Sequence, residues 1–402
     1  MDAQPTRIVV QKYGGSSVAD VERLRQVARR IAQARQGGAH VVAVVSAMGK
    51  TTDQLVRLAH EVTDTPDRRE LDMLLSAGER IAMALLAMAV RAEGLAATSL
   101  TGSQCGILTN DSAGNARIVE VRPFRVQDAL AQGHVVIVAG FQGTSWRREV
   151  TTLGRGGSDT TAVALAAALG ADCEIYSDVD GIYSADPRLV TAARRIDALS
   201  HDETLALARA GAKVLAADAV ALARMHGIAL YARRTDGTGG ETVVRLDAPR
   251  DRPWVSGVAG RPHAVLLRAR DAAGAEAMIA ALADAHLCPL AVTADAAAAD
   301  VLVARDVADA VDPAFDRAVA AVEAMPGSIG ALRGALASIV GPAVGREPGL
   351  ITAFREIVRA SGAEPLAVVA HGLTLSALVD PMVLTPVLAA LHARFVAEGA
   401  HA

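Results

Sequence analysis

Short apolar runs alternate with longer stretches of helical period over the first 245 residues. The apolar runs fit buried strands at Ile8–Gln11, His40–Ser46, Val135–Ala139 and Glu174–Ser177. Apolar residues at helical spacing predict helices from about Asp20 and over Leu71–Arg91, Asp159–Leu169 and Lys213–Met225. Unbroken Val and Ile runs are typical of strands that are covered on both faces of a mainly parallel sheet. We therefore expect an α/β fold in which helices sandwich the sheet.

The pattern changes after Asp247–Trp254, where Asp, Arg and Pro crowd together as in a linker. Two shorter segments follow, and each reads as strand–helix–strand and then strand–helix. The prediction is a first domain over residues 1–246 and two small α+β domains over residues 255–326 and 327–402.

Composition excludes several classes of protein. The chain has 402 residues, 51% of them hydrophobic and 21% charged, which rules out a disordered or fibrous protein. A net charge of −4 and 3% aromatic residues argue against a nucleic-acid partner. The longest apolar run, Ile81–Val90, is too short to span a membrane, and the polar start of the chain does not resemble a signal peptide. We expect a cytoplasmic protein with no membrane partner, in which Cys105 and Cys173 are buried thiols.

The first candidate for chemistry is the run Lys12-Tyr13-Gly14-Gly15-Ser16-Ser17, which follows the first strand. Paired glycines let the backbone approach an anion, and the lysine adds positive charge. An ordinary strand-to-helix turn with a surface lysine is the alternative. The run is not a Walker loop, since the required Gly-x-x-x-x-Gly-Lys pattern is missing from the sequence.

Two further polar runs lie at the ends of predicted strands. Gly154-Arg155-Gly156-Gly157-Ser158-Asp159-Thr160-Thr161 leads into a helix, whose N-terminal amides attract negative charge, and Arg155 can bind a carboxylate through two hydrogen bonds. Ser177–Tyr183, followed by Asp186-Pro187-Arg188, ends a strand where open α/β sheets bind ligands. A flexible surface loop and a plain Asp-Pro turn are the alternatives.

In this order and spacing, the three runs resemble the aspartate kinases of the amino acid kinase family, most closely the monofunctional enzymes of actinobacterial type. Other runs share the resemblance: Val45-Ser46-Ala47-Met48 with Thr51-Thr52, Ser76-Ala77-Gly78-Glu79-Arg80, Gly140-Phe141-Gln142-Gly143 and Gly211-Ala212-Lys213-Val214. It is dense over residues 7–235, and the later segments look like the paired ACT domains of these enzymes. The resemblance implies an amino acid kinase fold followed by two ACT-like domains.

The resemblance implies transfer of the γ-phosphoryl group of ATP to the side-chain carboxylate of L-aspartate, which gives 4-phospho-L-aspartate. Such a transfer depends on positioning and charge neutralisation, and an ionised acceptor needs no general base. The implied catalytic residues are Lys12, Asp159 and Lys213. The implied ATP-binding residues are Gly14, Gly15, Ser16, Ser46, Ser177, Asp178, Tyr183, Arg188 and Lys213.

The same resemblance implies that Glu79 holds the ammonium group of aspartate and Arg155 its α-carboxylate, with Thr52, Phe141 and Ser158 completing the pocket. Mg²⁺ is expected to bridge the phosphates mostly through ATP and water, with no metal ligand assigned to the protein. A homodimer through the ACT-like domains is also expected.

The resemblance weakens in the first ACT-like segment. The family pattern Asp-x-Pro-Gly is replaced by Asp271-Ala272-Ala273-Gly274, and the later Asn-x-Asp by Leu287-Cys288-Pro289-Leu290. The second ACT-like segment keeps more of the family pattern, with Gly341–Gly349 before a helix over Leu350–Ala360. We therefore expect weakened feedback inhibition by lysine plus threonine.

Two other functions stay open at this point. One is an enzyme of the same fold that phosphorylates a different amino acid, and the other is a non-catalytic, amino-acid-binding regulatory subunit. Intact Lys12, Asp159 and Lys213 count against the second. Methionines on the long helix, at Met73, Met83 and Met88, are interpreted as core residues.

Overall fold

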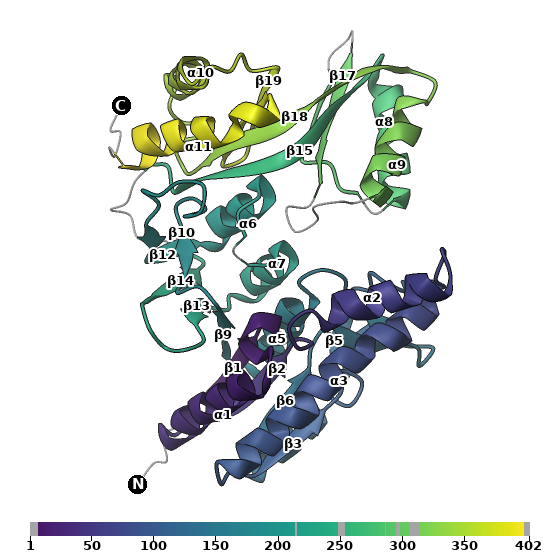
Figure 1. The fold of residues 1–402 in the computed structure, drawn as a ribbon, viewed down its shortest axis with the longest axis vertical. Helices are drawn as coiled ribbons and strands as arrows, with labels where there is room; N and C mark the ends of the chain where they lie inside the picture. The colour runs from purple at the N-terminus through teal and green to yellow at the C-terminus, as the bar shows by residue number, and fades with distance from the viewer. Residues whose placement is uncertain are drawn as a thin grey trace. The chain divides into compact units, whose positions relative to one another are not determined.

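The computed structural model describes residues 7–213, 215–247, 254–285, 287–294, 298–305 and 313–397 (Figure 1). These residues form two compact units. The first comprises Met1–Ile182, Asp197–His201 and Leu215–Ala248, and the second Tyr183–Ile196, Asp202–Val214 and Pro249–Ala402. Most of the expected linker, residues 248–253, lies outside the described residues, as do residues 295–297 of the alanine-rich run near Ala294. The predicted division into three domains stays a prediction.

An eight-stranded sheet forms the centre of the first unit, in the order β12-β14-β13-β9-β1-β2-β6-β3. From β13 to β3, neighbouring strands run parallel, whereas β14 is antiparallel to β13. The mainly parallel sheet is thus confirmed, and its parallel strands end at one edge. The strands are β1 (Ile8–Tyr13), β2 (His40–Val45), β3 (Ala97–Leu100), β6 (Val135–Ala139), β9 (Asp172–Ser177), β12 (Ala198–Ser200), β13 (Leu230–Arg234) and β14 (Glu241–Arg245).

Helices cover this sheet because each carries an apolar face. In α1 the residues Leu24, Val27 and Ile31 are buried at helical spacing, and α1 packs beside α3 (Figure 1). Helix α5 contacts β1, β9 and α7. The helices are α1 (Val21–Gln36), α2 (Thr51–Val62), α3 (Arg68–Ala92), α4 (Phe124–Ala131), α5 (Gly157–Leu169) and α7 (Ala217–His226), and a 3₁₀ turn (η1) spans Gly15–Val18.

The helix expected over Lys213–Met225 begins later, at Ala217. Gly211, with φ +110°, has a left-handed backbone that ends α6 (His201–Ala210), and Lys213 lies in the irregular connection that follows. The prediction extended the helix too far because it took the apolar residues of this connection as part of the helical period.

Two smaller sheets accompany the large one. A four-stranded sheet in the order β5-β4-β7-β8 is made by β4 (Ile107–Thr109), β5 (Ile118–Val121), β7 (Gln142–Ser145) and β8 (Val150–Thr152). A hairpin pairs β10 (Ile182–Tyr183) with β11 (Arg195–Ile196).

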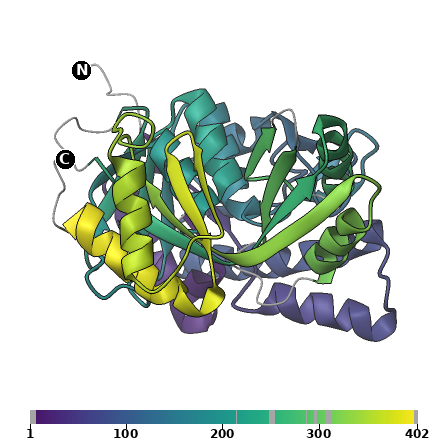
Figure 2. The same cartoon turned by 90° about the horizontal axis from the view of Figure 1, so that it is seen from above.

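The second unit repeats one element order, strand–helix–strand–strand–helix, as the sequence predicts. All strands of its sheet pair antiparallel, in the order β16-β17-β15-β18-β20-β19. Figure 2 shows the first pair of helices at one end of the long strands β15 and β18 and the second pair at the other end. The elements are β15 (Gly257–Ala269), α8 (Ala272–Asp284), β16 (Ala291–Ala294), β17 (Ala299–Ala304), α9 (Pro313–Glu323), β18 (Ser328–Val340), α10 (Leu350–Ala360), β19 (Ala367–His371), β20 (Thr374–Val379), the 3₁₀ turn η2 (Pro381–Val383), α11 (Leu384–His392) and the π turn η3 (Ala393–Ala397).

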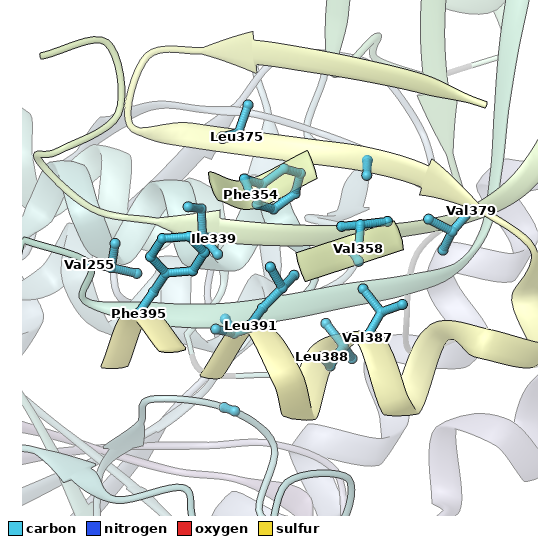
Figure 3. Packing of buried hydrophobic residues seen from close by; sticks show 14 of the residues in the cluster. Val255, Ile339, Phe354, Val358, Leu375, Val379, Val387, Leu388, Leu391 and Phe395 are labelled. Carbon is cyan, nitrogen blue, oxygen red and sulfur yellow. The ribbon is translucent and has the colours of Figure 1, made fainter. Parts of the chain in front are cut away.

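The core of the second repeat is built on both long strands. Figure 3 shows Phe354 of α10, Leu375 of β20 and Leu391 of α11 converging on Ile339 of β18. Ala185 and Val190, from the segment after β10, join the same core. Burial of these apolar side chains fixes that segment to the second repeat.

Helix α3 is less buried than the sequence predicts. Met83 is partly buried against the core of the first unit. Met73 and Met88 are 40% and 64% exposed, so the prediction that they fill the core is wrong. They lie off the stripe that faces the sheet, and this 25-residue helix is apolar on more than one side. It is the one helix among the described residues that is long and apolar enough to cross a membrane, but half of its apolar window is buried inside the structure. Cys105 and Cys173 are buried, as predicted.

Candidate active site

An ion pair between strand β1 and helix α5 lies at the centre of the candidate site. Lys12 Nζ is 2.6 Å from Asp159 Oδ1, and both side chains are 13% exposed. Lys12 points to the opposite face of β1 from Gln11 and Tyr13, because side chains alternate along a strand. Asp159 lies in the first turn of α5, where a carboxylate also interacts favourably with the helix dipole.

The glycine turn follows Lys12 directly and packs tightly against its surroundings. The Gly14 amide donates to the carbonyl of Tyr176 at the end of β9 (3.3 Å). A Cβ at Gly15 would lie 3.0 Å from the Ala47 carbonyl oxygen, and a Cβ at Gly14 would lie 3.5 Å from Lys12 Nζ. Small residues are needed here because the backbone of the turn lies beside the lysine and the segment after β2.

Glu79 is a buried carboxylate with one oxygen still available. Its Oε1 accepts from the Ala47 amide at 3.0 Å, whereas its buried Oε2 has no hydrogen-bond partner. Burial raises the pKa of Glu79 to about 7, and the hydrogen bond from Ala47 opposes that rise. A buried oxygen without a partner fits a site for a cationic group that the protein itself does not supply.

The segment after β6 is held in an unusual conformation. Phe141 has φ +67°, in the left-handed region that non-glycine residues rarely adopt. Its amide donates to Thr161 Oγ1 (3.1 Å) and its carbonyl accepts from the Leu153 amide (2.9 Å). A Cβ at Gly140 would lie 2.8 Å from Ser158 Oγ, so the buried Ser158 lies directly beside this segment. These contacts bring Phe141 and Ser158 close together.

Three other predicted residues lie just before α5, in α2 and just after β2. Arg155 is exposed in the loop just before α5, and Thr52 lies in the first turn of α2. The amide of Ser46, at the end of β2, donates to the carbonyl of Tyr13 at 3.1 Å.

A cavity of about 320 Å³ opens between the glycine turn, α1 and the ends of β9 and β13. Three of the residues expected to bind ATP line it, namely Ser16, Ser177 and Asp178. Thr235 also lines the cavity and connects two of its walls. The Thr235 hydroxyl contacts Ser17 Oγ at 2.6 Å and donates to the Ser177 carbonyl at 2.8 Å. The other lining residues are Ser17, Asp20, Glu22, Arg23, Gln26, Arg234 and Asp236.

Tyr183, Arg188 and Lys213 belong to the second unit. Arg188 makes a two-bond ion pair with Asp186, at 2.9 and 2.6 Å. That pair lowers the pKa of Asp186, and the charge of Lys213 lowers it further. The positive charges of Arg188 and Lys213 thus both act on the carboxylate of Asp186.

The segment that carries Tyr183 is anchored by the residue that follows it. Ser184 is buried and its hydroxyl lies 2.8 Å from His392 Nε2 of α11. The same hydroxyl accepts from the Arg194 amide (3.1 Å), which closes the segment on itself.

The site residues predicted from the sequence do not include two buried polar residues of this region: Asp72, which no motif named, and Gln142, which was part of a motif but was given no role. Gln142 Nε2 donates to the Ser76 carbonyl at 3.0 Å, and Asp72 accepts hydrogen bonds from Gly114 and from Thr152 at the end of β8. The available signal was an acid on the apolar face of a helix, seven residues before Glu79. In the described part of the chain, no group of three or more His, Cys, Asp and Glu side chains is arranged to hold a metal ion.

The fold and this site define the class of the protein. A family model described as "Amino acid kinase family" matches residues 7–232, more than half of the chain. The chain therefore belongs to the amino acid kinase family, and the fold expected from the sequence is confirmed.

Within that family, the chain is similar to curated aspartokinases. The chain is 41% identical to the aspartokinase of Mycolicibacterium smegmatis, and the alignment covers 96% of both chains. It is 56% identical to the aspartokinase of Mycobacterium tuberculosis over 63% of this chain and 61% of that protein. Among solved structures, E. coli aspartokinase III in complex with aspartate and ADP matches with a TM-score of 0.83 at 24% identity, covering 96% of this chain and 99% of that one. This last match shows the shared fold.

Proposed function

We propose that this chain is an ATP-dependent aspartokinase, which transfers the γ-phosphoryl group of ATP to the β-carboxylate of L-aspartate. The observation that carries the proposal is the arrangement of Lys12, Asp159 and Glu79 around one edge of the parallel sheet. The aspartokinases of M. smegmatis and M. tuberculosis support the same activity, and the E. coli structure that shares this fold contains aspartate and ADP.

Lys12 is well placed to stabilise the charge on the phosphoryl group during transfer. Its ammonium lies beside Gly14 and is oriented by Asp159 through the 2.6 Å contact. The backbone of the glycine turn contributes N–H groups to the phosphates, and Lys213 adds a second positive charge. The acceptor carboxylate is ionised at neutral pH, so the reaction needs no general base.

Recognition of aspartate depends on charges of opposite sign. Glu79 Oε2 binds the ammonium group, and Arg155 binds the α-carboxylate through two hydrogen bonds. Ser158, Thr52 and the backbone around Phe141 complete the pocket. The β-carboxylate is then the group left to face the phosphoryl donor.

ATP binds with its phosphates at the glycine turn, and Ser46, Asp178, Tyr183 and Arg188 contribute to nucleotide binding. Mg²⁺ would supply positive charge beside the phosphates, and we expect it to be coordinated mainly by the nucleotide and water.

A hydroxamate assay tests the proposed reaction. Hydroxylamine traps the acyl phosphate formed from ATP, Mg²⁺ and L-aspartate, and we expect a signal that depends on aspartate. In Arg155→Ala the signal should fall sharply, because the α-carboxylate loses its partner. Arg147→Ala is the matched control, since Arg147 is an exposed arginine of the same unit, 81% exposed at its side chain.

The assay also separates the alternatives. A signal with another amino acid but none with aspartate would replace the proposed acceptor. No signal with any acceptor, in folded protein that does not bind ATP, would favour a regulatory subunit and contradict the proposal.

We also propose that lysine and threonine inhibit this enzyme weakly. In the first ACT-like segment, Asp271 caps α8 by accepting from the Gly274 amide at 2.8 Å, so this acid serves the helix. Titration of lysine and threonine into the assay should leave activity nearly unchanged, and strong concerted inhibition at low concentration would contradict the idea. The homodimer and the cytoplasmic location remain predictions.

A further inference from the structure

Helix α3 presents a row of polar groups toward the candidate site. Asp72, Ser76 and Glu79 are buried and lie on one face, because residues spaced by three or four positions share a face of a helix. Each fastens α3 to a different segment. Glu79 binds the segment after β2, the Ser76 carbonyl binds Gln142, and Asp72 binds the Gly114 turn and the end of β8.

Asp72 is a fully buried carboxylate that the proposed chemistry does not use. Both of its oxygens accept from the Gly114 amide at 3.0 Å. Oδ1 also accepts from the Thr152 hydroxyl at 2.6 Å, and Oδ2 from the Thr152 amide at 3.2 Å. A carboxylate suits this position because every partner is a donor, and an ionised acceptor makes shorter and stronger hydrogen bonds.

Both partners of Asp72 lie next to the loop that carries Arg155. Thr152 ends β8, and the chain reaches Arg155 three residues later. Gly114 precedes Asn115, whose Oδ1 would lie only 2.8 Å from a Cβ at Gly154. The loop around Gly114 is itself joined to β8, since the Ala116 amide donates to the Thr152 carbonyl at 2.8 Å.

We propose that Asp72 is a positioning residue for aspartate recognition, which fixes the spacing between Glu79 and the loop of Arg155. This inference rests on the proposed function. One rigid helix carries both Asp72 and Glu79, so the position of the ammonium-binding group is tied to the position of the carboxylate-binding loop. Asp72 does not touch the substrate and acts through Thr152 and Gly114.

Steady-state kinetics of Asp72→Asn test the proposal. Asparagine keeps one acceptor oxygen but places an NH₂ group against donors at Gly114 or Thr152. We expect KM for aspartate to rise about tenfold or more, since small misplacements of binding groups are costly. KM for ATP should stay within about twofold of the wild type, because the glycine turn is not attached to Asp72.

Glu174→Gln is the matched control. Glu174 is also a buried carboxylate of the first unit, but it binds Gln11, Tyr176 and Arg233 on the opposite side of β1 from Lys12. It should lower thermal stability while leaving KM for aspartate unchanged. An equal rise in both KM values for Asp72→Asn, or the same rise in Glu174→Gln, would overturn the inference and indicate a general loss of stability.

Two further variants keep the test decisive. Thr152→Val removes the 2.6 Å hydrogen bond with little change in volume, and should raise KM for aspartate in the same direction even if Asp72→Asn fails to fold. In an Arg155→Ala background the effect of Asp72→Asn should shrink, since residues that act through one another are not additive. If Asp72→Asn raised KM for aspartate by the same factor in both backgrounds, the inference would be overturned. A wild-type protein without aspartate-dependent activity would instead contradict the proposed function.

Discussion

Neighbouring residues of strand β1 belong to two different polar groups on the two faces of the sheet. On one face, Lys12 pairs with Asp159 and remains partly open to solvent. On the other face, Gln11 and Tyr13 join a buried network with Glu174 and Tyr176. The network also includes the ion pair of Glu174 with Arg233.

The two groups differ in how much of their hydrogen-bonding capacity the protein itself uses. In the buried network both carboxylate oxygens of Glu174 are occupied by protein donors, and the rings of Tyr13 and Tyr176 stack at 4.9 Å. On the Lys12 face, the lysine has further donors than its single carboxylate contact uses, and Glu79 has a free oxygen. Buried charge alone therefore does not mark the site, and unused hydrogen-bonding capacity is the better indicator.

The largest expected effect is the loss of catalysis in Lys12→Met. Removal of one charged group that stabilises the transferring phosphoryl should lower kcat about 10³-fold. The hydroxamate assay measures this effect, and circular dichroism should show an intact fold. A near-normal kcat would show that Lys12 takes no part in the reaction, and the two faces of β1 would then not differ in function.

Glu174→Leu should affect stability instead of chemistry. It leaves Arg233 and the hydroxyl of Tyr176 without their main partner, so we expect the free energy of unfolding to fall by about 3 kcal/mol. Urea denaturation measures this loss. Both KM values should stay close to those of the wild type, and a selective rise in either would show that the network takes part in substrate binding.

Glu79→Gln should raise KM for aspartate about 30-fold, because the ammonium group loses a charged partner. The pH profile offers a second test. Since ionised Glu79 binds the ammonium group and burial raises its pKa to about 7, kcat/KM for aspartate should fall as the pH decreases through 7. The variant should lack that limb of the profile.

The same substitution should also change stability, with a sign that follows from the raised pKa. The folded protein holds the proton of Glu79 more tightly than the unfolded chain, so its contribution to stability is present below about pH 4.5 and is lost as the pH rises through 7. Without ligand, Glu79→Gln should therefore melt at a higher temperature than the wild type at pH 8, and the difference should shrink toward pH 5. Identical melting curves at pH 8 would contradict the burial of an ionised carboxylate.

The smallest effect is expected for Tyr13→Phe. It removes one hydrogen bond, from the Tyr13 hydroxyl to Gln11 Oε1 at 3.0 Å, and keeps the stacked ring. A loss of about 1 kcal/mol is expected, measurable by urea denaturation. Unchanged kinetics would sharpen the comparison with Lys12, its neighbour on the same strand.

The sequence predicted the sheet and the main helices because they follow clear periods. The Val-rich runs of β2 and β6 and the spacing of Leu24, Val27 and Ile31 in α1 carry this information locally. The start of α7 was missed because Gly211 and the turn after it interrupt an otherwise apolar stretch. Met88 was misplaced because hydrophobic residues are not always buried.

The candidate site could be predicted as a set of residue types but not as a set of contacts. Family motifs named Lys12, Glu79 and Asp159, yet which oxygen of Glu79 stays without a partner depends on the placement of Ala47, which lies in the segment after β2. Asp72 was missed for the same reason, since its partners at Gly114 and Thr152 are distant in sequence. The left-handed backbone of Phe141 also depends on tertiary contacts, because its residue type disfavours that conformation.

The pairing of β15 with β18 has a consequence for how the second unit unfolds. These strands lie at the centre of one sheet and join the two repeats along most of their length. Neither repeat can melt without exposing a long unpaired edge of the other, so the two repeats form one cooperative folding unit. A nick introduced between α9 and β18 should accordingly leave two fragments that stay associated and unfold in a single transition.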